Sequence, residues 1–109
     1  MLQAIPLGLV TVAAAGTPTP ITAALITAAG GLLPPSSGVS RIDVHAHNGN
    51  AGVLFVKVNG VILDNLLTPA NSVTAHWCLQ ACGNEINPLI FLLDVATNGD
   101  GAYVTLWIE

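Results

Sequence analysis

Charged side chains are what this sequence lacks most. Only 7% of its 109 residues are Asp, Glu, Lys or Arg, against about 25% in an ordinary soluble domain. Just two are basic, Arg41 and Lys57, and the formal net charge is -4. Binding to nucleic acid needs several Lys or Arg contacts with phosphates, and a membrane-surface helix needs a basic polar face. We therefore expect neither a nucleic-acid nor a membrane partner.

Long uninterrupted apolar runs are also missing, although residues 1–40 carry no charge. A transmembrane helix needs about 20 apolar residues in a row, and Thr, Gly and Pro interrupt the segment between residues 11 and 20. A secretory signal needs a basic start. Met1–Leu9 has no Lys or Arg, and Pro6 interrupts its apolar stretch. The sequence thus favours neither kind of segment.

Cysteine is scarce as well, with Cys78 and Cys82 as the two examples. In a regular strand, residues four apart lie roughly 13 Å apart, whereas a disulfide needs Cα atoms within about 7 Å. We expect two reduced thiols that bind no metal ion, which suits assembly in a cytoplasm.

What the sequence does contain is alternation with a period of two. Polar and apolar residues alternate over 41–47 and over 72–81, which predicts strands with one buried face. Residues 53–58 and 89–95 are apolar on both faces with few exceptions, and 7–15 and 102–108 are predicted as further strands. Turn residues separate these segments at 48–50, 59–60, 87–88 and 98–101, the last of which we interpret as a hairpin turn and not a calcium loop.

These patterns predict an all-β fold: a single antiparallel β-sandwich, jelly-roll-like or Ig-like, that spans residues 1–109. We expect at least six strands and no helix longer than about three turns. The loop-rich apolar segment 1–38 is a candidate assembly arm. Residues 20–29 are ambiguous, because Thr19, Pro20 and Gly30 suit the ends of a helix, while the β-branched residues between them favour a strand. We favour the strand.

Few residues suggest chemistry. His45, His47, His76, Cys78 and Cys82 are the candidate ligands for zinc, and a tetrahedral site requires that the strands carrying them are neighbours. The paired C-x-x-C spacing of zinc sites is absent. The sequence also holds no G-x-S-x-G elbow, phosphate loop or dinucleotide fingerprint. We therefore expect no enzyme activity, no cofactor and no metal ion.

The aromatic residues point to a different use. In the last strand Ala102, Val104, Leu106 and Ile108 share one face, while Tyr103, Thr105 and Trp107 share the other. Aromatics beside polar neighbours are typical of protein contacts. Two alternatives stay open: that both faces are core, or that the aromatic face binds carbohydrate.

Three stretches resemble small β-sandwich virion proteins of tailed bacteriophages, of the decoration or cement type. They are L-V-T-V-A-A-A-G-T-P-T-P-I-T at 9–22, R-I-D-V-H-A-H-N-G-N-A-G-V-L-F-V-K-V-N-G at 41–60 and N-G-D-G-A-Y-V-T-L-W-I-E at 98–109. These proteins open with a V-T-V strand that runs into A-G-T, and a G-D-G turn precedes their last strand. The three stretches cover under half of the chain, and residues 61–93 match nothing in the family.

The resemblance implies a non-enzymatic structural protein that binds and stabilises a phage head. Its implied partners are the major capsid protein and copies of itself, as a trimer, at the capsid surface of the virion. A tail, connector or fibre component, or a carbohydrate-binding β-sandwich, are the alternatives. From the apolar start of the chain and the last strand we select Leu2, Ile5, Leu7, Tyr103 and Trp107 as the candidate interface.

Overall fold

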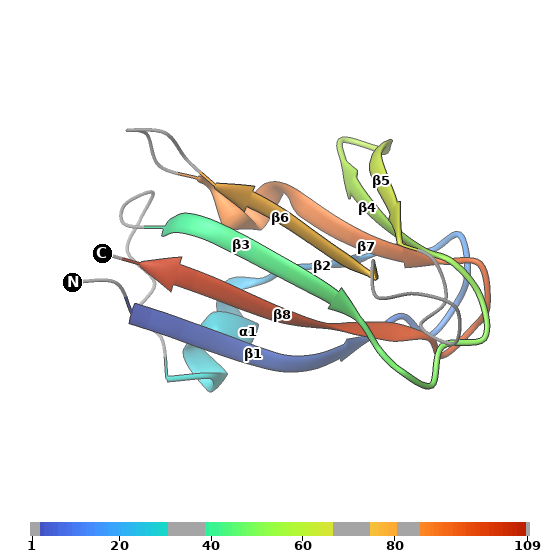
Figure 1. Cartoon of the computed structure of the whole chain (residues 1–109), viewed down its shortest axis with the longest axis horizontal. Helices are drawn as coiled ribbons and strands as arrows, with labels where there is room; N and C mark the ends of the chain where they lie inside the picture. Colours follow the sequence, from blue (N-terminus) through green and yellow to red (C-terminus); the bar gives the residue numbers. More distant parts are fainter. Residues whose placement is uncertain (1–2, 31–38, 67–74, 81–85, 109) are drawn as a thin grey trace.

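Alternating apolar residues form the inner faces of two antiparallel sheets that pack on each other (Figure 1). The computed structural model describes residues 3–30, 39–66, 75–80 and 86–108. Each sheet has four strands, in the orders β1-β8-β3-β6 and β2-β7-β4-β5. The predicted all-β sandwich is therefore confirmed, as is the expectation of at least six strands.

The first sheet is built around the last strand of the chain. Strand β8 (Gly101–Ile108) pairs with β1 (Gln3–Thr11) on one side and with β3 (Val39–Ala46) on the other. Strand β6 (His76–Gln80) pairs with β3 and forms one edge. Of the predicted strand at 72–81, residues 72–74 and 81 lie outside the described residues.

The second sheet is shorter and ends in a hairpin. It contains β2 (Thr19–Pro20), β7 (Phe91–Val95), β4 (Leu54–Val58) and β5 (Val61–Leu66), and a 3-10 turn, η2 (Pro88–Ile90), leads into β7. Asn59 and Gly60 join β4 to β5 with φ angles of 53° and 77°. Positive φ at both positions is the signature of the tight hairpin that an Asn-Gly pair predicts. Strand β5 itself is not predicted from the sequence.

The core lies between the two sheets and consists of the side chains on the inward face of each, mainly from β3, β8, β4 and β7. Its fully buried side chains include Ile42, Val44, Leu54, Val56, Leu93, Val95, Val104 and Leu106. The face of β8 chosen as core from alternation is thus confirmed for Ala102, Val104 and Leu106, while Tyr103 on the other face is 47% exposed.

Most of the segment 20–29 forms a short helix, so the strand prediction is wrong there, although Pro20 ends the short strand β2. Helix α1 covers Ala23–Ala28, and the Thr22 side chain caps it by accepting a hydrogen bond from the Leu25 N–H at 3.2 Å. Ile26 turns into the core and is 1% exposed. A cap and a buried anchor outweigh the modest helix cost of β-branched residues.

No helix among the described residues is long and apolar enough to cross a membrane.

The start of the chain belongs to the sandwich and is no free arm over its described part. Strand β1 pairs with β8 along its length, and Ile5, Val10 and Val12 are buried in the core. Strand β1 is an edge strand of the first sheet, and the core of the same chain buries its apolar residues. The sequence alone suggests that a partner covers them. Residues 31–38 lie outside the described part.

The turns at 48–50 and 98–101 connect the sheets to each other, so 98–101 is not a hairpin. Residues 48–50 lead from β3 to the second sheet, and 98–101 lead from β7 back to the first. The Asn50 amide exchanges two hydrogen bonds with the backbone of Gly101, at 2.8 and 2.9 Å. The Asp100 carboxylate accepts the N–H groups of Ala51 and Gly52. Its oxygens therefore cross-link two turns of the protein.

Candidate functional site

The outward side of the first sheet carries aromatic, histidine, charged and thiol side chains. Strand register aligns them in three cross-strand rows: Leu9, Tyr103, His45 and His76; Pro6, Thr105, Asp43 and Cys78; and Ala4, Trp107, Arg41 and Gln80. All twelve are exposed or half-buried. We call these twelve residues the open face. It is apolar and aromatic over β1 and β8, and polar over β3 and β6.

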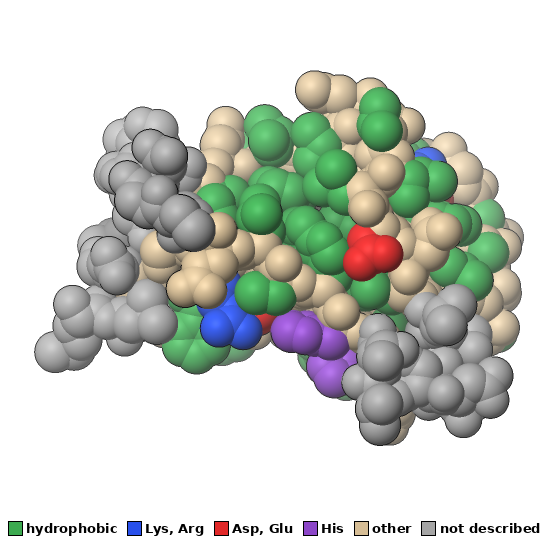
Figure 2. Space-filling view, turned by 45° about the horizontal axis from the view of Figure 1, so that its top comes forward, with side chains coloured by type: hydrophobic (Ala, Val, Ile, Leu, Met, Phe, Trp, Pro, Cys, Tyr) green, Lys and Arg blue, Asp and Glu red, His purple; other side chains and the backbone are tan. Residues whose placement is uncertain are grey.

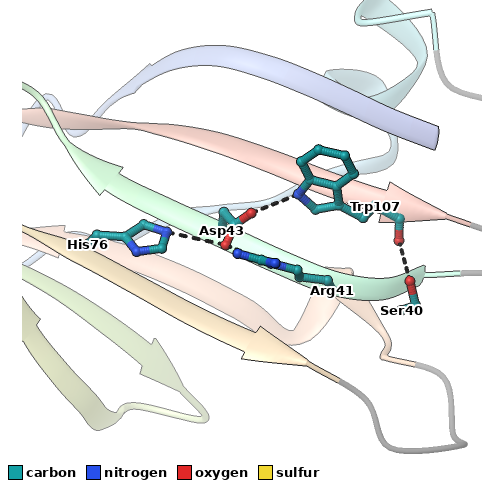
Figure 3. Close-up of polar contacts among 5 residues, drawn as sticks. All are labelled: Ser40, Arg41, Asp43, His76 and Trp107. Carbon is teal, nitrogen blue, oxygen red and sulfur yellow. Dashed lines mark hydrogen bonds and ion pairs between the residues drawn. The ribbon is translucent and has the colours of Figure 1, made fainter. Parts of the chain in front are cut away.

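Asp43 is the centre of the polar half (Figure 3). Its Oδ1 accepts from Arg41 Nε at 3.0 Å and contacts His76 Nε2 at 3.2 Å. Its Oδ2 accepts from Trp107 Nε1 at 2.7 Å. The carboxylate is 17% exposed, whereas the Arg41 and His76 side chains are each 39% exposed. Asp43 therefore links three strands across the open face.

The electrostatics of Asp43 follow from these contacts. Burial by itself raises the pKa of a carboxyl, but hydrogen bonds from Trp107, Cys78 and Arg41 and the charge of Arg41 outweigh it and lower the pKa of Asp43. Burial and the neighbouring carboxylate raise the pKa of the Cys78 thiol. At neutral pH the pair is thus a carboxylate and a protonated thiol, which is a poor nucleophile.

Trp107 is held in place by this network. Its indole N–H is engaged by Asp43, and its backbone carbonyl accepts from the Ser40 hydroxyl at 3.3 Å. Trp107 is half-buried, and a fixed aromatic loses little conformational entropy when a partner covers it. Leu9 lies opposite Tyr103, and the two are 43% and 47% exposed. Together they form an apolar surface on the β1–β8 side.

The histidines gather at one end of the open face. The ring centroids of His45 and His76 are 5.8 Å apart, and those of His47 and Tyr103 are 5.7 Å apart. An open pocket of about 370 Å³ lies here, lined by His45, Ala46, Asn48 and Tyr103. The sequence singles out these histidines, but their arrangement depends on the pairing of β3 with β6.

That pairing meets the condition set for a metal site, although a full ligand set does not form. His45 lies opposite His76, and Asp43 lies opposite Cys78. Among the described residues, no group of three or more His, Cys, Asp or Glu side chains is arranged to hold a metal ion. Cys78 is exposed, and Cys82 lies outside the described part.

Over the described residues, the second sheet carries one comparable polar group, and the chain itself covers it. Lys57 Nζ donates to Asp94 Oδ2 at 2.7 Å, while Asp94 Oδ1 accepts the N–H groups of Gly16 and Val95. The Asp94 side chain is only 4% exposed. Hydrogen bonds from Lys57, Val95 and Gly16 overcome the effect of burial and lower the pKa of Asp94. This pair attaches the segment after β1 to the second sheet and is structural.

Apolar side chains are also exposed away from the open face. Among the described residues, the large ones are Val61, Ile62, Leu63, Leu79, Leu89 and Ile90. Three of them are consecutive on β5, which is the edge of its sheet. Figure 2 brings β5 and β6 toward the viewer and shows hydrophobic side chains over much of this side, with few charged ones.

The five candidate interface residues have different outcomes. Tyr103 and Trp107 lie on the open face, as the alternation predicts. Ile5 is 4% exposed in the core, so its assignment to an interface is wrong, because its side of β1 faces the second sheet. Leu7 packs partly against the core. Leu2 lies outside the described residues.

Sequence reasoning missed Asp43 as the organising residue. Its position on the polar side of a strand is visible in the alternation, and so is its neighbour Arg41, but His76 and Trp107 reach it from strands far away in the chain. Comparison with protein-family models, with curated proteins and with solved structures gave no match to this chain.

Proposed function

We propose that this chain is a non-enzymatic structural protein of a virion, a decoration protein that docks on the head of a tailed bacteriophage. The observation that carries the proposal is the open face. It offers Tyr103, Leu9 and a fixed Trp107 beside one carboxylate whose charge is balanced by Arg41. Interface centres are typically depleted in charge and enriched in Tyr, Trp and Arg.

The scarcity of charge supports the same proposal. Only 7% of the residues are charged, so few charged side chains hydrate the surface of this protein. Exposed apolar patches mark interaction sites. The apolar edge strand β5 supports contacts between copies, since unprotected edges pair readily with other chains. Neighbouring subunits in a particle would cover these surfaces. The motifs at 9–22, 41–60 and 98–109 are what points to phage heads in particular.

The direct test is binding to phage capsids that lack their decoration protein. Purified chain is mixed with the shells, the shells are pelleted, and the bound fraction is measured across a concentration series. Tyr103→Ala should weaken binding by about 2 kcal/mol, or roughly 30-fold, as an aromatic anchor does. Leu89→Ala is the matched control, because Leu89 is 42% exposed but lies in η2, outside the open face.

Either of two results would overturn the proposal. One is a wild-type chain that binds no shell. The other is a Leu89→Ala variant that loses as much binding as Tyr103→Ala, since the open face would then not be the docking surface. Parallel pelleting with isolated tails separates a head protein from a tail, connector or fibre component.

The pocket beside Tyr103 favours a second candidate, a carbohydrate-binding module. An exposed phenol ring next to the Asn48 amide and the His45 imidazole combines an apolar platform with polar groups that orient a ligand. Titration with soluble oligosaccharides distinguishes the two functions. A sugar that perturbs the amide signals of 45–48 and 103 at 1:1 stoichiometry would support this candidate, and shell binding without any sugar response would exclude it.

A further inference from the structure

His45 and His76 lie in one row of the open face, and the spacing of their imidazole rings has no part in the proposed docking. The two residues lie directly opposite each other on β3 and β6, and their ring centroids are 5.8 Å apart. Two imidazoles bound to one tetrahedral zinc ion have centroids roughly 5 Å apart, given zinc–nitrogen bonds of about 2.0–2.1 Å. Both side chains are exposed, and the observed spacing of 5.8 Å is within about 1 Å of the one that a shared ion requires.

Asp43 prepares His76 for such a role. An ionised carboxylate can only accept a hydrogen bond, so the contact of Asp43 Oδ1 with His76 Nε2 places the imidazole proton on Nε2. The lone pair of the neutral ring is then on Nδ1. A carboxylate that holds the far nitrogen of a histidine is the usual outer partner of a metal ligand, since it fixes the tautomer and makes the ring more basic.

His47 is not prepared in this way. The Gly49 N–H donates to His47 Nδ1 at 3.1 Å, which occupies the lone pair of that ring and leaves its proton on Nε2. His47 therefore differs from His76 in its free nitrogen, although both lie at the same end of the sheet. This contrast gives the chain an internal control.

We propose that His45 and His76 form a cross-strand site for a divalent transition-metal ion of the zinc class, with Asp43 as the outer partner of His76. Two protein ligands leave the remaining positions to water. The site is therefore weaker than a structural zinc site with four protein ligands. It also binds Cu²⁺ more tightly than Zn²⁺, in the order that nitrogen ligands follow.

The test is titration of the full chain with zinc chloride, followed by two-dimensional NMR of the imidazole nitrogens and by calorimetry. The signals of His45 and His76 should shift together and saturate at one ion per chain, while His47 should remain unchanged. His45→Ala should abolish the shift without disturbing the fold, because His45 is exposed. His47→Ala should leave the affinity as it is in the wild type.

Two further variants separate this site from other sources of zinc binding. Asp43→Asn should weaken the affinity by about 10- to 100-fold, as the loss of an outer-shell carboxylate does. The double variant Cys78→Ser with Cys82→Ser should keep the affinity, because the proposed ligands are imidazoles. Amide spectra of each variant verify that the sandwich is intact.

Three outcomes would overturn the proposal: no saturable shift with Zn²⁺ or Cu²⁺, an equal response from all three histidines, or loss of binding in the cysteine double variant. The last outcome would instead identify a thiolate site.

Discussion

Asp43 and Asp94 occupy comparable positions on the outward faces of the two sheets, yet their surroundings differ. The chain covers Asp94 with its own segment at Gly16, and the carboxylate is 4% exposed beside Lys57. No segment among the described residues covers Asp43 in the same way, and its carboxylate is 17% exposed beside Arg41, His76 and Trp107. The protein therefore closes one polar face within the fold and leaves the other accessible. The polar groups around Asp43 already have hydrogen-bond partners within the chain, and their side chains are still accessible to a partner protein. Both properties suit a docking surface.

The largest effect that distinguishes the two sites is on stability. Asp94→Ala should destabilise the fold by about 3–5 kcal/mol, because it leaves the half-buried Lys57 ammonium and two backbone N–H groups without their acceptor. Urea denaturation followed by circular dichroism measures this. Asp64→Ala is the control, since Asp64 is exposed on β5 and an exposed substitution changes stability by less than about 0.5 kcal/mol. Equal effects of the two variants would mean that the Lys57–Asp94 pair stabilises nothing.

Asp43→Ala should cost less, about 1–2 kcal/mol, because water can replace part of what its partners lose. Its main effect should be on function, since Trp107 is no longer held in place. We expect a folded chain with weaker binding to capsid shells. Urea denaturation and shell pelleting on the same preparation separate the two effects. An Asp43 variant that unfolds as readily as the Asp94 variant would remove the distinction between the open and the covered face.

Acid should destabilise the fold through both carboxylates. The pKa values of Asp43 and Asp94 are lowered in the folded state. Their contribution is therefore complete above the pKa of an unfolded aspartate, about 3.9, and is lost as the pH falls through the folded values. Urea midpoints measured from pH 7 down to pH 2 should drop below about pH 4. Asp94→Asn should be less stable at pH 7 and show a shallower drop, and a drop as steep as in the wild type would contradict the assignment.

The strands were largely predictable, because each signal is local. The alternation at 41–47 and 102–108 and the Asn59–Gly60 pair require only the sequence nearby. Strand β5 escaped prediction, since Val61, Ile62 and Leu63 are apolar without being buried and so show no alternation. Helix α1 was missed because the burial of Ile26 against the core outweighs local propensity.

The candidate site was less predictable than the fold. Tyr103 and Trp107 were found from the alternation in β8. The Asp43 network was not, because Trp107 Nε1 and His76 Nε2 reach the carboxylate from strands 64 and 33 residues away. Only the order of strands in the sheet brings them together. The same reason explains Asn50 and Asp100, whose hydrogen bonds join turns that the sequence does not relate.

The smallest effect concerns Cys78, which reports on the charge of Asp43 from the neighbouring strand. Burial and the carboxylate raise the pKa of this thiol, so the folded chain should react with iodoacetamide more slowly than an unfolded cysteine, because only the thiolate attacks. Asp43→Asn removes the charge and should speed the reaction, because the carboxylate is one of the causes that raise the pKa of the thiol, while the effect of burial stays. Asp64→Asn, which removes a carboxylate elsewhere, should not change the rate. Titration in denaturant should find both thiols of the chain free, as expected if Cys78 and Cys82 are not joined. An unchanged rate in Asp43→Asn would mean that the carboxylate does not act on the thiol, and the polar half of the open face would then be less tightly coupled than its geometry indicates.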